Sequence, residues 1–81
     1  MTPIAELKPG DVVLAFVWPD GTRRSVRGGP LEVASIAPTG VQCDGHPQIE
    51  IIAAARNRSA RYSNGATLAI VDNAPGVSSD G

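Results

Sequence analysis

Turn-forming residues break this chain into short apolar runs. Nine glycines and seven prolines fall among only 81 residues, and few apolar runs between them are longer than a single strand. Frequent turn signals between short apolar runs favour several short strands over a helical bundle. The sequence therefore predicts a mostly β domain.

The clearest strand signal covers residues 12–18, directly after the turn sequence Pro-Gly-Asp at 9–11. This run is apolar on both faces, which is typical of a strand buried on two sides or curled within a barrel. The sequence Trp-Pro-Asp-Gly-Thr at 18–22 matches a turn pattern in which proline presets φ and glycine tolerates positive φ. We therefore expect a hairpin whose return strand, residues 22–27, places Arg23, Ser25 and Arg27 on one face.

The middle of the chain predicts a second hairpin and then becomes ambiguous. Residues 31–37 and 41–44 form two short β patterns, and Pro-Thr-Gly at 38–40 suggests a tight turn between them. Residues 48–51 alternate like a strand, whereas the three alanines at 53–55 favour a helix. We expect a strand at 48–54 and leave a helix or a turn open for 55–62.

A last strand is expected at residues 66–72, and the small polar residues 73–81 predict a flexible C-terminal tail. About five short strands in a single domain at residues 1–72, too small for a sandwich, predict an all-β, partly open small barrel. The alternative is an α+β fold with a short helix within 48–62.

Three segments of the chain resemble the opening of SH3-like barrels of the KOW type. They are Lys-Pro-Gly-Asp-Val-Val at 8–13, Gly-Pro-Leu-Glu-Val-Ala-Ser-Ile at 29–36 and Gly-Val-Gln-Cys-Asp-Gly at 40–45. The pattern has Gly-Asp before the first strand, a glycine before the second and a glycine-ended hairpin after it. The resemblance covers residues 8–45 and implies an SH3-like barrel. The basic residues that the family carries in its first loop are partly matched by Arg23, Arg24 and Arg27.

The composition indicates a small core and a reducing compartment. A chain of 81 residues buries a limited surface, so a protein partner or a second copy would help to stabilise it. The single cysteine, Cys43, excludes an internal disulfide. Because no apolar segment follows a positive N-terminal region and no apolar run approaches 18 residues, we expect a cytoplasmic protein with no membrane contact.

Six of the seven basic residues are arginines, and they form two clusters, namely Arg23, Arg24 and Arg27, then Arg56, Arg58 and Arg61. The guanidinium group is planar, always charged and offers forked donors that match phosphate or carboxylate oxygens. Tyr62, directly after the second cluster, could stack on a base beside a charged groove. This pattern predicts an anion-facing surface for DNA or RNA. The competing interpretation is that the arginines are solvated and pair with carboxylates such as Glu32 or Glu50.

Trp18, at the mouth of the first hairpin, either caps the core or anchors a partner protein. The sequence predicts neither an enzyme nor a cofactor. One Cys and one His, Cys43 and His46, cannot complete a zinc site in a monomer, and no phosphate-binding glycine motif is present.

The acidic pI of about 5.6 argues against a general DNA-coating protein. We therefore expect a non-catalytic protein-binding or assembly module, an adaptor, inhibitor or self-assembling subunit, that uses a strand edge and the Trp18 region. The alternative is a nucleic-acid-binding regulator that contacts the phosphate backbone through the two arginine clusters.

Overall fold

The computed structural model describes residues 1–72 and shows a nearly all-β molecule with one antiparallel sheet that does not close. The elements in chain order are β1 (Thr2–Pro3), the 3-10 helix η1 (Ile4–Glu6), β2 (Val12–Val17), β3 (Arg23–Ser25), β4 (Leu31–Cys43), β5 (His46–Ala53), β6 (Arg61–Tyr62) and β7 (Leu68–Val71). The strand order is β1-β7-β2-β4-β5-β6, and β3 also pairs with β2. The predicted tail at 73–81 lies outside the described residues.

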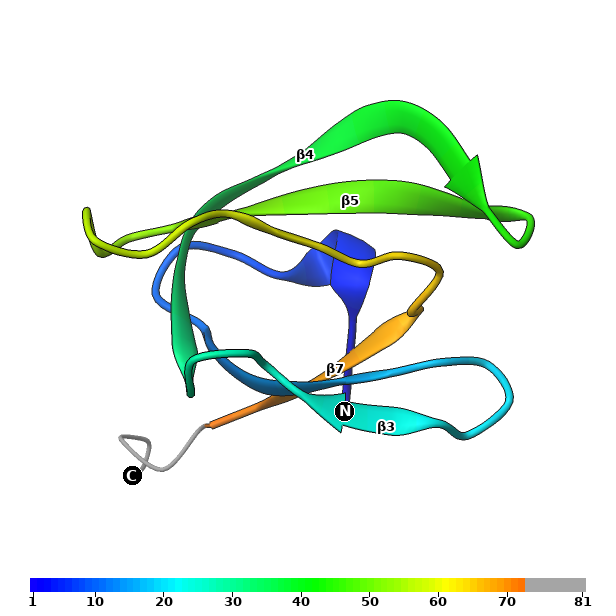
Figure 1. Cartoon of the computed structure of the whole chain (residues 1–81), viewed down its shortest axis with the longest axis horizontal. Helices are drawn as coiled ribbons and strands as arrows, with labels where there is room; N and C mark the ends of the chain where they lie inside the picture. The colour runs from blue at the N-terminus through cyan, green and yellow to red at the C-terminus, as the bar shows by residue number, and fades with distance from the viewer. Residues whose placement is uncertain (73–81) are drawn as a thin grey trace.

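The long strand β4 joins the two halves of the sheet. Its first residues, Leu31 and Glu32, pair with β2, and from Val33 to Cys43 it pairs with β5. Figure 1 shows the consequence, because β4 rises from the layer that contains β2, β3 and β7 and then arches over the molecule beside β5. One bent strand thus places two layers of the sheet face to face.

The hydrophobic core lies between these layers. Val13 and Phe16 of β2, Ala69 of β7 and Ile51 of β5 belong to one buried cluster, which also includes Ile4 of η1. Strand β2 carries buried side chains on both faces, as the apolar run predicted.

The first predicted hairpin is confirmed. Strand β3 pairs with β2 through Ala15–Ser25, Phe16–Arg24 and Val17–Arg23. The Trp18 amide donates to the Thr22 carbonyl at 2.8 Å, and the Thr22 amide donates to Oδ1 of Asp20 at 2.8 Å. The aspartate of the turn sequence therefore fixes the turn with its own side chain.

The second predicted hairpin is wrong in its turn position. Pro38, Thr39 and Gly40 lie within β4, where the pairing register shifts between Pro38 and Gln42, so this glycine accompanies a bulge. The chain reverses instead at Asp44-Gly45, where φ is 50° and 79°. Two consecutive positive φ values match the two-residue hairpin turn that Asp-Gly favours, so the stronger local signal decided the turn.

The helix alternative within 48–62 is also wrong. Strand β5 runs to Ala53, turns occupy 54–60, and β6 follows. The isoleucines decide this, because Ile51 is fully buried when the segment is extended. Ala54 and Ala55 are exposed, so a helix there would have no apolar face to bury.

Candidate binding groove

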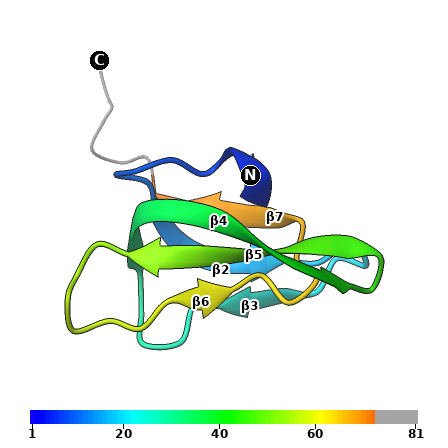
Figure 2. The same cartoon turned by 90° about the horizontal axis from the view of Figure 1, so that it is seen from above.

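An open groove lies between β3 and the segment that contains β6. It encloses about 350 Å³. It is lined by the chain's three aromatic residues, three of its arginines and four smaller side chains, namely Phe16, Trp18, Tyr62, Arg24, Arg27, Arg61, Ser25, Val26, Ala60 and Asn64. We call it the seam groove, because it follows the line along which the sheet fails to close. Figure 2 shows β3 and β6 on the same side of the molecule.

The groove is open because neither flanking strand pairs with the other. Within residues 1–72, β3 pairs only with β2 and β6 pairs only with β5. The Trp18–Thr22 hydrogen bond sets the alternation of the β2–β3 ladder, so the backbone groups of Arg23 and Ser25 point away from β2. The groove is therefore bordered by a strand edge whose outward backbone N–H and C=O groups are not part of a ladder.

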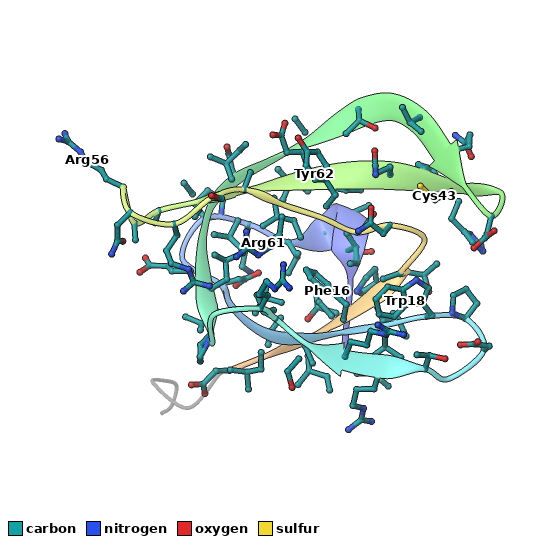
Figure 3. The ribbon with its side chains drawn as sticks, in the orientation of Figure 1. Phe16, Trp18, Cys43, Arg56, Arg61 and Tyr62 are labelled. Carbon is teal, nitrogen blue, oxygen red and sulfur yellow. The ribbon has the colours of Figure 1, made fainter. Side chains whose placement is uncertain are left out.

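The aromatic side chains run from the floor of the groove to its rim. Phe16 is 7% exposed, Trp18 is half-buried, and Tyr62 is 45% exposed. The indole Nε1 of Trp18 donates to the Asn64 carbonyl at 3.0 Å, and the Tyr62 hydroxyl donates to Glu50 Oε2 at 3.3 Å. Trp18 also packs against the core, so it both caps the core and lines the groove. Figure 3 shows these aromatic residues together with Arg61 around the opening.

Arg58 and Arg61 hold one end of the seam together through backbone carbonyls. Nη1 of Arg58 donates to Pro30 O at 2.9 Å, and its Nη2 donates to Gly29 O at 3.2 Å and Arg27 O at 3.3 Å. Nη2 of Arg61 donates to the same Arg27 carbonyl at 3.2 Å. Side-chain donors thus connect two segments where strand pairing is missing. We call this arrangement the carbonyl clamp.

Arg61 also binds the backbone directly before its own strand. Its Nη1 donates to Ala60 O at 3.2 Å and to Ser59 O at 3.4 Å. Its Nε is buried without a hydrogen-bond partner in the structure. Most of the forked donors of Arg58 and Arg61 are therefore committed to the protein's own backbone.

Gly28 is favoured by the backbone of its turn, and it lies against the carbonyl clamp. Its φ is +86°, and a Cβ atom there would lie 3.4 Å from Nη2 of Arg58. A Cβ at this position would be in ordinary van der Waals contact with the guanidinium, so the cost of a side chain comes from the positive φ. No local sequence pattern shows that the Arg58 side chain approaches Gly28, because the two residues are far apart in the sequence.

The other arginines of the two clusters are separated by the fold. Arg24 and Arg27 are exposed and line the seam groove. Arg23 neighbours Arg24 on the strand, so its side chain points to the opposite face. Arg56 is exposed on the turn between β5 and β6 and extends far from the groove in Figure 3. The six arginines therefore do not form one surface.

The cysteine and histidine singled out in the sequence lie on either side of the Asp44-Gly45 turn. Cys43 and His46 are cross-strand partners, and the thiol is half-buried. Within the described part of the chain, no group of three or more His, Cys, Asp or Glu residues is close enough together to hold a metal ion. A search of the same residues finds no helix with the length and apolar character needed to cross a membrane.

Comparison of the chain with protein-family models, with curated proteins and with solved structures finds no match.

Proposed function

We propose that this chain is a non-catalytic protein-binding module and that the seam groove is its binding site. The observation that carries the proposal is the convergence of all three aromatic side chains on a groove bordered by an unpaired strand edge. Aromatic and arginine side chains are enriched at energetically important positions of protein interfaces. An exposed strand edge can also receive an extended peptide through main-chain hydrogen bonds.

We further propose that the fold is an SH3-like, partly open barrel. The resemblance at residues 8–45, the strand order and the long bent β4 shared by both layers support this assignment. The cytoplasmic location remains a prediction, supported by the single thiol of Cys43.

Nucleic-acid binding is the second candidate, because Arg24 and Arg27 lie beside Tyr62 and Trp18 in one groove. Single-strand binders combine cationic and aromatic side chains in this way. Two observations weaken the candidate. The guanidinium groups of Arg58 and Arg61 already bind carbonyls, and Glu50 places a carboxylate at the Tyr62 hydroxyl.

Selection from a random peptide display library, followed by NMR titration, tests the proposed function. Selected peptides are added to ¹⁵N-labelled protein, and we expect the amide shift changes to cluster in β3 and β6. Tyr62→Ala should weaken binding, whereas Val41→Ala, a change at another exposed apolar residue outside the groove, should not. Shift changes that cluster elsewhere, or a library with no binder, would refute the assignment of the groove.

The nucleic-acid alternative has its own measurement. Labelled single- and double-stranded DNA and RNA are titrated with the protein at two salt concentrations, with fluorescence anisotropy as the readout. Binding that weakens steeply with salt would favour phosphate contact. Absence of binding at low salt would remove this alternative.

A further inference from the structure

The seam groove is positively charged in a chain that is close to neutral. Its lining contains Arg24, Arg27 and Arg61 and no Asp or Glu, whereas the whole chain has a formal net charge of −1. We propose that the occupant of the groove is an acidic, extended peptide segment of a partner protein, an inference that rests on the proposed function. It carries an aromatic or large aliphatic side chain flanked by carboxylates.

Arg24 and Arg27 supply the charge that would select such a peptide. Both side chains are exposed, and within residues 1–72 neither one is paired with a carboxylate. Arg24 is the cross-strand partner of Phe16, so the two side chains project from the same face of the β2–β3 ladder, and both line the groove. Arg27 lies at the clamped end, where its own carbonyl is held by Arg58 and Arg61. Carboxylates at these arginines would bracket an apolar side chain placed against Phe16 and Trp18.

The number and placement of the charges favour a peptide over a nucleic acid. Proteins that depend on phosphate contacts typically neutralise several phosphates, about 6–10 in strongly salt-dependent cases. The groove offers two guanidinium groups that are not already bound to carbonyls. Glu50, hydrogen-bonded to Tyr62 at the rim, would repel a continuous phosphate backbone. A peptide strand, in contrast, can use the edge of β3 and leave a neutral residue next to Glu50.

Trp18 provides the readout, because it is the chain's single tryptophan and it lines the groove. Three synthetic peptides without tryptophan are titrated while Trp18 fluorescence is followed. The first alternates Glu and Phe, the second replaces Glu by Gln, and the third replaces Glu by Lys. Two exposed ion pairs of ordinary strength predict that the Glu peptide binds about tenfold more tightly than the Gln peptide at low salt, which corresponds to about 1.4 kcal/mol in total.

Charge reversal tests whether Arg24 and Arg27 cause the preference for the Glu peptide. The double variant Arg24→Glu with Arg27→Glu should lose the preference for the Glu peptide and gain one for the Lys peptide. Circular dichroism is compared with that of the unchanged protein, since both side chains are exposed and should tolerate replacement. Arg56→Glu, a reversal on the turn away from the groove, is the matched control and should keep the original preference.

The outcomes separate this inference from the proposed function. Equal binding of the Glu and Gln peptides, or a preference that Arg56→Glu alters as much as the groove variant does, overturns the acidic specificity and leaves the groove as a peptide site. If all three peptides fail to bind while the groove binds library-selected peptides of other composition, the proposed acidic occupant is wrong and the groove remains a peptide-binding site. Salt-steep binding of a labelled oligonucleotide with no Glu-peptide binding replaces it with the nucleic-acid alternative.

Discussion

The arginine side chains occupy two different environments, which the sequence alone could not distinguish. Arg58 reaches three carbonyls that lie 28 to 31 residues earlier in the chain, whereas Arg24 and Arg27 remain exposed at the groove. The planar fork of the guanidinium group suits it to several acceptors at once. The same residue type therefore stabilises the fold at one position and is available for binding at another.

Removal of the Arg58 side chain should destabilise the protein more than removal of the Arg56 side chain. Hydrogen bonds to charged groups contribute about 1.5–3 kcal/mol when they are satisfied, and this partly exposed side chain should fall at or below the lower end. We expect Arg58→Ala to lower the free energy of unfolding by about 1 kcal/mol. Arg58→Lys should retain only part of that free energy, because an ammonium group lacks the planar fork of the guanidinium. Urea unfolding followed by Trp18 fluorescence measures this. Equal losses for Arg58→Ala and Arg56→Ala would contradict the carbonyl clamp.

Asp20 should make the first hairpin sensitive to acid. The hydrogen bonds from the Thr22 backbone amide and the Thr22 side chain lower the pKa of this carboxyl below its ordinary value of 3.8. A lowered folded-state pKa stabilises the protein above the unfolded-state pKa, and that stabilisation disappears as the pH falls through the folded-state value. NMR titration of the Asp20 carboxyl should give a midpoint below 3.8.

The matched variant is Asp20→Asn, which keeps an acceptor for the Thr22 amide at every pH. Its turn signals should not change through the acidic range in which those of the unchanged protein do. A midpoint at or above the ordinary aspartate value would show that the turn does not depend on the carboxylate.

At the scale of the elements, the turns decide where the strands end, and their backbone angles decide which residues are tolerated. Asp44 and Gly45 both have positive φ and produce the β4–β5 hairpin, whereas Pro38 to Gly40 lie inside β4. The sequence contained both signals. Asp-Gly prevailed because it fits a two-residue turn whose twist matches the flanking strands.

Gly45→Ala should therefore destabilise this hairpin through the backbone alone. The φ of Gly45 is +79°, and an added Cβ would have no atom within 4 Å, so no steric contact contributes. A left-handed residue with a side chain costs about 1–2 kcal/mol, and less for asparagine. We expect Gly45→Ala to lose about 1 kcal/mol of unfolding free energy in urea and Gly45→Asn to lose less. The reverse order would contradict the turn geometry.

For the whole molecule, the distinctive feature is a sheet that remains open along one line. Strand pairing connects β1 through to β6, but no ladder joins β3 to β6, and the carbonyl clamp instead connects the segment after β3 to the residues at the start of β6. This arrangement leaves the seam groove lined by aromatic side chains. The missing pairing between β3 and β6 is thus the feature on which the proposed function depends.

The protein should be monomeric at micromolar concentrations. In the described part of the chain, the large exposed hydrophobic side chains are Met1, Val41 and Tyr62, which come from three separate segments. Single exposed apolar residues do not make the contiguous patch that a stable interface needs. Light scattering should give a mass near 8.3 kDa that does not change with concentration. A mass that doubles with concentration would support a self-assembling subunit, one of the forms expected for the binding module, and would make a second copy the candidate occupant of the groove.

Local signals accounted for much of the fold and for little of the groove. The apolar run at 12–18, the turn at 18–22 and the all-β composition were interpreted correctly, because each depends on residues that are close in sequence. The turn within 38–40 and the helix alternative failed where two local signals competed. Ile51 settled the second case by burial against residues distant in sequence.

The sequence by itself determined that the chain is mostly β, where the first hairpin reverses, and that six guanidinium groups are present. Those properties follow from backbone preferences and from fixed charge. Only the tertiary structure decided which guanidinium groups are bound to carbonyls and that Phe16, Trp18 and Tyr62 line one groove. The physical reason is that these contacts join segments roughly 30 to 46 residues apart. Their proximity depends on the bend in β4, which no local pattern specifies.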